Sequence, residues 1–265
     1  MFGLAVLFPA FLILSSIPAR WESLSIAGRL MGNAAITVLL FAGWPLVLTA
    51  ITRVSWTTGL SLRRASVGAF VSCAILGLSL WPFAYEMSVM LTSTERLEAL
   101  EKLFAPFKAQ LDAVPLWLKL FSLAVIPAVC EELFFRGFLL SAFRSGMSKP
   151  LAVAFSGMLF GLFHVIVQQS LFAERFVPTC FLGLILAAIC VRTGSVLPGM
   201  LLHVMHNGFL LSLSSFTEEL KSLGIGVEEH QHLPALWLGL AALAVVGGTF
   251  GLLASSVDDS TRTEA

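Results

Sequence analysis

Residues 114–143 read VPLWLKLFSLAVIPAVCEELFFRGFLLSAF, a run of thirty mostly apolar residues interrupted near its centre by two glutamates and an arginine. A helix needs about 20 mostly apolar residues to cross the hydrocarbon core of a bilayer, so this run is long enough to span it. A charged side chain within a span costs at least about 2.5 kcal/mol and is a candidate functional group. The stretch therefore predicts a membrane-spanning helix that carries a chemical site.

The rest of the chain has the composition of an integral membrane protein. Of its 265 residues, 57% are hydrophobic and only 12% are charged, whereas soluble domains carry about 25% charged residues. The 16 Lys and Arg balance 16 Asp and Glu, which leaves no basic excess for binding nucleic acid. These values exclude an ordinary soluble enzyme, a disordered regulator and a nucleic-acid-binding protein.

The apolar runs predict an all-α fold, a polytopic transmembrane helical bundle of about eight spans. Between the third and fourth spans, the apolar residues of Ser93–Asp112 recur every three or four positions, which predicts an amphipathic helix at the membrane interface. We divide the chain into N-terminal segments with this helix (1–113), a core (114–216), and a loop, last span and polar tail (217–265). The predicted spans are Phe2–Pro18, Asn33–Thr52, Ser66–Leu91, Val114–Phe143, Leu151–Gln168, Val177–Val191, Val196–Phe216 and Leu233–Ala254.

The Lys and Arg residues of the short loops predict the orientation in the membrane. On one side the loops carry basic residues without acidic ones: Arg53, Arg63, Arg64, Arg144, Lys149 and Arg192. On the other side acidic residues accompany the basic ones, which are Arg20, Arg29, Arg175 and Lys221. The first side, and with it both termini, is therefore expected in the cytoplasm of a multi-pass protein of the cell membrane.

The charges within 114–143 divide into a pair and a single acid. Glu132 and Arg136 are four residues apart on one helix face, with the acid first, which is the favourable order for an ion pair. A buried ion pair is their ordinary structural interpretation. Glu131 points about 100° away and is not neutralised by that arginine. Glu131 is thus a candidate general base.

The next two polar spans bring further groups towards Glu131. A short turn joins the fourth and fifth spans into an antiparallel hairpin, and Glu131 and His164 are each about 25 Å of helix from its middle. In the seventh span, His203 and Asn207 are four residues apart on one face, which His206 partly shares. Glu131, His164, His203 and Asn207 are therefore expected to converge, displaced towards the cytoplasmic side. A hydrogen-bonded core histidine and polar contacts between helices are the structural alternatives.

Three motifs on successive spans together resemble those of the CPBP family of intramembrane proteases, which includes CAAX prenyl proteases (type II CAAX endopeptidases) and lysostaphin resistance protein A-like proteins. The resemblance covers approximately Trp117 to Ser212. The motifs are Glu131-Glu132-x-x-x-Arg136, Phe160-x-x-x-His164 and His203-x-x-x-Asn207.

The resemblance implies a role for each of these residues. Glu131 and His164 would activate a water for attack on a peptide carbonyl, and preorganised donors on His203 and Asn207 would stabilise the oxyanion. The supporting residues would be Glu132 and Arg136, which fix the helix face, and Phe160, which packs over the water.

The same residues are compatible with a zinc-dependent reaction and with a metal-free one. Two histidines and a glutamate (His164, His203 and Glu131) are a plausible Zn²⁺ ligand set with an open position for water. A metal-free glutamate mechanism would use the same side chains.

These observations favour an intramembrane endopeptidase that hydrolyses a peptide bond of a membrane-associated protein or peptide, in CAAX-type or in bacteriocin or leader processing. The expected partners are this substrate and the lipid bilayer. Two alternatives stay open: a non-catalytic membrane protein that uses its buried Glu and His for proton or cation transport, and an inactive protease-derived scaffold.

Overall fold

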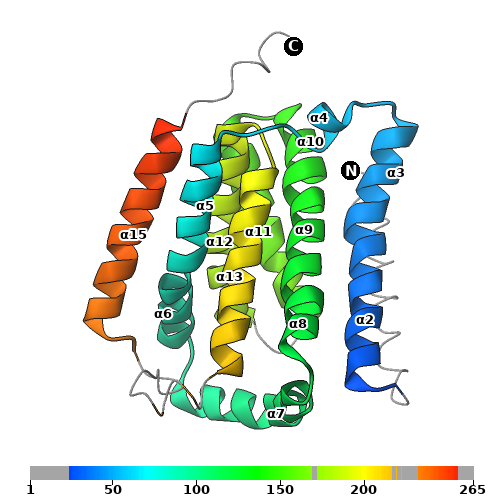
Figure 1. Ribbon diagram of the computed structural model, residues 1–265. Coiled ribbons are helices and arrows are strands. Elements are labelled where there is room, and N and C mark those ends of the chain that lie inside the picture. The colour runs from blue at the N-terminus through cyan, green and yellow to red at the C-terminus, as the bar shows by residue number, and fades with distance from the viewer. Residues whose placement is uncertain (1–23, 169–171, 217–218, 220–221, 223–231, 256–265) are drawn as a thin grey trace.

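The chain folds into a bundle of helices that run side by side (Figure 1). The computed structural model describes residues 24–168, 172–216, 219, 222 and 232–255. Within this part of the chain the structure is helical and contains no strand, which confirms the predicted all-α polytopic bundle. The predicted span Phe2–Pro18 lies outside the described residues.

The first described rod lies at one edge of the bundle in Figure 1. It consists of α2 (Ile26–Thr37), the π-helical segment η2 (Val38–Gly43) and α3 (Trp44–Ile51). The rod begins before the predicted start at Asn33, so Arg29 belongs to a helix rather than to a loop.

A short helix, α4 (Trp56–Gly59), leads to the next rod, which contains α5 (Val67–Ser79) and α6 (Trp81–Leu91). The two helices meet at Leu80 because Pro82 has no N–H to continue the hydrogen-bonding pattern.

The predicted amphipathic helix is α7 (Thr94–Asp112), which lies across one end of the bundle (Figure 1). The hydroxyl of Ser93 caps it by accepting a hydrogen bond from the backbone N–H of Arg96. Leu103 and Phe107 are exposed on its surface, as expected for a helix at a membrane interface.

The rod that carries the Glu-Glu sequence contains two π-helical segments within an otherwise α-helical rod. Glu131 and Glu132 lie between two π-helical segments, which are often found inside α-helices at functional sites. The rod consists of α8 (Leu116–Lys119), η3 (Leu120–Val125), α9 (Ile126–Glu132), η4 (Leu133–Leu139) and α10 (Leu140–Arg144).

The remaining helices are α11 (Lys149–Gln168), α12 (Phe172–Thr193), α13 (Leu197–Ser215) and α15 (Ala235–Ala254). Gly161 lets α11 and α12 approach closely, since a Cβ there would lie 2.9 Å from the Cβ of Cys180 and 3.0 Å from the carbonyl oxygen of Phe176. This contact fixes the height of α11 against α12.

Five of the described helices are long and apolar enough to cross a membrane: Ile26–Ile51, Val67–Leu91, Lys149–Ile166, Arg175–Thr193 and Ala235–Ala254. The α8–α10 rod and α13 run through the bundle beside them (Figure 1), although their charged and polar residues make them less apolar. The α8–α10 rod and α13 carry Glu131, His203 and Asn207 of the predicted site, whereas His164 lies on α11.

Candidate active site

One side of α9 holds a buried ion pair. Glu132 Oε1 lies 2.5 Å from Arg136 Nη1, and both side chains are 0% exposed. Arg136 Nη2 donates to the carbonyl oxygen of Gly183 at 3.1 Å, and the guanidinium lies 4.2 Å from the centroid of the Phe160 ring. The predicted pair is present, and its contacts join α9 and η4 to α11 and α12.

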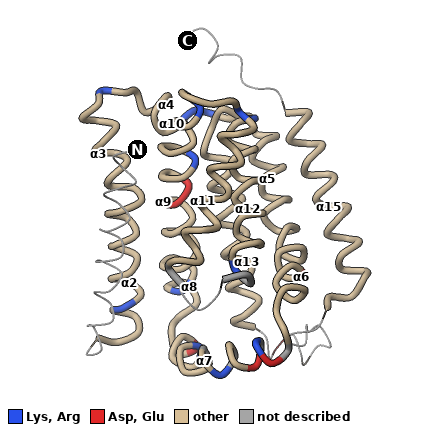
Figure 2. The backbone as a smooth tube through the Cα atoms, turned by 180° about the vertical axis from the view of Figure 1, so that it is seen from behind, with Lys and Arg blue, Asp and Glu red and all other residues tan. Residues whose placement is uncertain are grey.

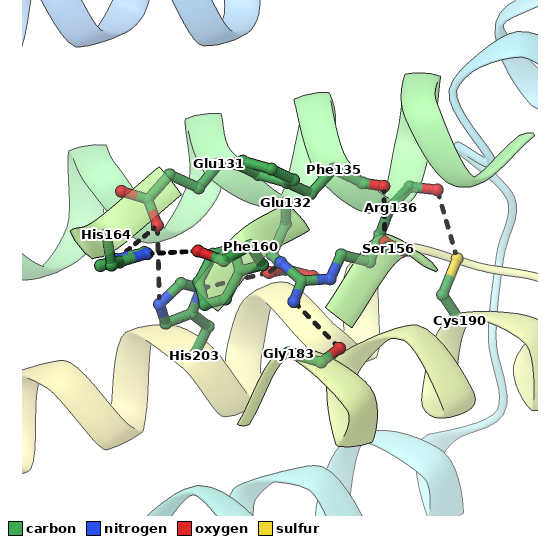
Figure 3. A network of polar contacts seen from close by, with 10 residues as sticks. All are labelled: Glu131, Glu132, Phe135, Arg136, Ser156, Phe160, His164, Gly183, Cys190 and His203. Carbon is green, nitrogen blue, oxygen red and sulfur yellow. Dashed lines mark hydrogen bonds and ion pairs between the residues drawn. The ribbon is translucent and has the colours of Figure 1, made fainter. Parts of the chain in front are cut away.

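Glu131 points instead towards two histidines from other helices (Figure 3). Its Oε2 lies 3.9 Å from Nε2 of His164 on α11 and 4.0 Å from Nε2 of His203 on α13. The Glu131 side chain is 12% exposed, whereas the neighbouring Glu132 is fully buried. Consecutive glutamates thus face different surroundings, as their angular separation on a helix predicts.

The other nitrogen of each imidazole has a partner that fixes the ring. Nδ1–H of His164 donates to the carbonyl oxygen of Phe160 at 2.9 Å. Nδ1–H of His203 donates to Oε1 of Glu132 at 3.2 Å. A carbonyl can only accept, and an ionised carboxylate likewise, so Nδ1 carries the proton in both rings. Both Nε2 atoms are therefore left to face Glu131.

The three side chains open into a cavity of about 720 Å³. Asn207 lines the same cavity one helical turn after His203 on α13, as expected. His206 also lines it, although its Nδ1 is buried. Trp81 and Tyr85 of α6 complete the opposite wall, so that the cavity extends from the histidines towards the end of the bundle near α7.

Phe160 lines the cavity beside the two histidines. Its ring is 1% exposed and its centroid lies 4.5 Å from that of His164 and 5.7 Å from that of His203. The Phe160 ring also meets the Arg136 guanidinium, so it contacts both this cation and the two histidines, whereas Glu132 contacts His203 directly.

The three residues predicted as zinc ligands do not form a metal-binding group as they are placed. Among the described residues, no group of three or more His, Cys, Asp or Glu could hold a metal ion.

Two features of the site were not predicted from the sequence. The first is the contact of His203 with Glu132, which was assigned to the ion pair alone. The second is Arg175, which was placed in a loop because the sixth span was expected to begin at Val177. The helix begins at Phe172, and Arg175 lines the cavity. His164 and Arg175 are about equally far along the chain from the connection between α11 and α12, and this spacing could have indicated that they lie at the same height.

Another acid within a span, Glu86, lies away from this site. Its carboxylate accepts hydrogen bonds from His232 Nδ1 at 2.6 Å and from the backbone N–H of Leu233 at 2.5 Å. Glu86 therefore holds the segment that precedes α15.

The fold and the site together define a helical membrane protein with an acid and two imidazoles gathered in an internal cavity. Residues 113–209 match the family model described as type II CAAX prenyl endopeptidase Rce1-like. The matched segment contains all three motifs, and the predicted resemblance to this family is confirmed. The family is one of proteases, so the match indicates intramembrane protease activity in general. No curated protein and no solved structure matches the chain.

Proposed function

We propose that the protein hydrolyses a peptide bond of a membrane-associated substrate with a water activated by Glu131 and His164. The observation that carries this proposal is the convergence of Oε2 of Glu131 with two Nε2 atoms, at 3.9 and 4.0 Å, beside a cavity. A water about 2.8 Å from each of two such atoms forms hydrogen bonds to both. The water then lies next to a general base and an open volume for the substrate.

In the proposed reaction the water gives a proton to Glu131 while its oxygen bonds to the carbonyl carbon. The carbonyl oxygen becomes an oxyanion, which accepts hydrogen bonds from the Asn207 amide and from Nε2–H of His203 when that ring carries a second proton. The C–N bond then breaks, and the proton held by Glu131 passes to the leaving amine. His164 orients the water through Nε2, since its Nδ1–H is held by Phe160.

The positions of the charges support the proposed orientation. Figure 2 shows Lys and Arg gathered at the end of the bundle near α4 and α10, whereas α7 at the other end carries both signs of charge. We place the α4–α10 end in the cytoplasm. His203 lies only six residues after the start of α13 at that end, so the reacting atoms are nearer the cytoplasm than the rest of the cavity is.

The substrate proposal follows from the family description, which names CAAX prenyl substrates. The candidates are a lipid-modified protein ending in a CAAX sequence and a bacteriocin or leader peptide held at the membrane. Both would bring an extended peptide to the cavity from the bilayer.

The test is cleavage of membrane-tethered peptides of these two kinds by the purified full chain in lipid vesicles. We expect wild type to cleave at least one kind, and Glu131→Gln and His164→Ala to lose cleavage. Ser145→Ala, in the exposed turn after α10, is the matched control. An inactive wild type whose proton or cation flux depends on Glu131 would contradict the proposal and favour transport.

The same preparation tests the metal-free reaction. We expect cleavage to continue after treatment with a strong chelator. Loss of cleavage on chelation, with recovery on adding Zn²⁺ and one tightly bound zinc per chain, would contradict that part of the proposal.

A further inference from the structure

We propose that Arg175 binds the free C-terminal carboxylate of the substrate, and so determines which peptides the site accepts. This inference rests on the proposed endopeptidase function. It begins from the charge of the cavity wall: among the described residues that line the cavity, Arg175 is the only Lys or Arg, and Glu131 is the only Asp or Glu.

The height of Arg175 in the bundle places it beside the reacting groups. His164 lies four residues before the end of α11, and Arg175 lies three residues after the start of α12. The two helices are antiparallel neighbours, and the close contact of Gly161 with Phe176 fixes their relative height. The guanidinium is therefore at the depth of the His164 imidazole, one helix away.

The guanidinium is available to a ligand. The Arg175 residue is exposed, and no acidic side chain among the described residues forms an ion pair with it. This differs from Arg136, which is fully buried against Glu132. A planar guanidinium binds a carboxylate with two parallel hydrogen bonds, which a neutral amide cannot reproduce.

The separation of opposite charges within the cavity gives the substrate a direction. A carboxylate is repelled by Glu131 and attracted by Arg175, so the C-terminus of a peptide is drawn to the α12 side of the cavity. The peptide bond to be cleaved then lies upstream, at Glu131 and His164. Adjacent packed helices are about 8–10 Å apart, a distance that about three extended residues cover.

The experiment compares a membrane-tethered peptide that ends in a free carboxylate with the same peptide ending in a carboxamide. For wild type we expect kcat/KM to be about 10- to 100-fold higher for the free acid, the size of one charged hydrogen-bonded contact. Arg175→Gln should bring the ratio of the two peptides close to one, mainly through KM. Arg175→Lys should keep part of the preference, and Arg144→Gln, at the other end of the bundle, should keep all of it.

Equal cleavage of both peptides by wild type would overturn the inference without needing any variant, and would leave the endopeptidase function intact. A preference that survives in Arg175→Gln would overturn it too. If instead cleavage by wild type, but not by Arg175→Gln, depends on anionic lipid in the vesicles, then Arg175 binds a lipid headgroup and the inference is wrong. Failure of the proposed function is distinguishable, because Glu131→Gln would then match wild type on both peptides.

Discussion

The two sides of α9 show what neighbouring glutamates become in different surroundings. Glu132 is fully buried and touches both Arg136 and His203, at 2.5 and 3.2 Å. Glu131 is 12% exposed beside a cavity, and its closest ionisable neighbours are 3.9 and 4.0 Å away. A carboxylate whose oxygens accept hydrogen bonds from the protein stabilises the structure, whereas a carboxylate with room for a water beside it can react with that water. His203 connects the two, because each of its nitrogens faces one glutamate.

The strongest test of this difference is Glu131→Gln. The amide has nearly the shape of the acid but cannot take a proton from water, so we expect kcat to fall about 10³-fold. The free energy of unfolding should change by about 0.5 kcal/mol or less, because no Lys or Arg of the described residues forms an ion pair with Glu131. Steady-state cleavage and denaturation in detergent measure the two effects. A kcat within tenfold of wild type would show that Glu131 is not the base.

For the buried ion pair we expect a large loss of stability, the reverse of the small loss expected at Glu131. Arg136→Met leaves the Glu132 carboxylate without its cation, and removing one partner of a buried pair costs about 3–5 kcal/mol. The double variant Arg136→Met with Glu132→Leu should recover much of that loss, since apolar replacements of both partners are often tolerated. Thermal unfolding of the three proteins provides the comparison. A single variant as stable as wild type would contradict the assignment.

A third test changes the distance between the helices rather than a charge. In Gly161→Val the added atoms would meet Cys180 and Phe176 at about 3 Å, and overpacking of this kind costs about 1–3 kcal/mol. Because α11 carries His164, kcat/KM should fall as well. Gly146→Ala is the matched control, since a Cβ at Gly146 meets nothing within 4 Å. If the two variants had the same stability and the same kcat/KM, the close approach of α11 to α12 would not be needed for either.

The smallest effect is expected at a third glutamate, near the edge of the bundle. Glu86→Gln weakens the hydrogen bonds to His232 and Leu233, but the His232 side chain is 68% exposed. Solvent screening therefore limits the loss of stability to about 0.5–1 kcal/mol. Hydrogen exchange at the start of α15 should increase, while peptide cleavage stays at the wild-type rate. A loss of cleavage would show that this contact supports the site.

The sequence predicted those features that depend on helical periodicity. The different surroundings of Glu131 and Glu132 follow from the angle between successive residues, and the meeting of Glu131 with His164 follows from their equal distance from one turn. The position of Arg175 could not be predicted from the sequence. An arginine near the end of an apolar run looks the same in the sequence whether it lies in the loop or in the first turn of the helix. It also missed the Glu132–His203 contact, since the rotation of one helix relative to another depends on packing.

The π-helical segments on either side of Glu131 give this rod an unusual tolerance in length. A π-turn holds one more residue than an α-turn, so removing a single residue from Leu120–Val125 can restore regular α-helix without breaking the rod. Because the extra residue is held within one turn, the deletion would leave the α8 end in nearly the same rotation relative to the rest of the rod. The α7 helix, attached to that end, would keep its direction of approach to the bundle, so the chain can change in length here while Glu131 keeps its place.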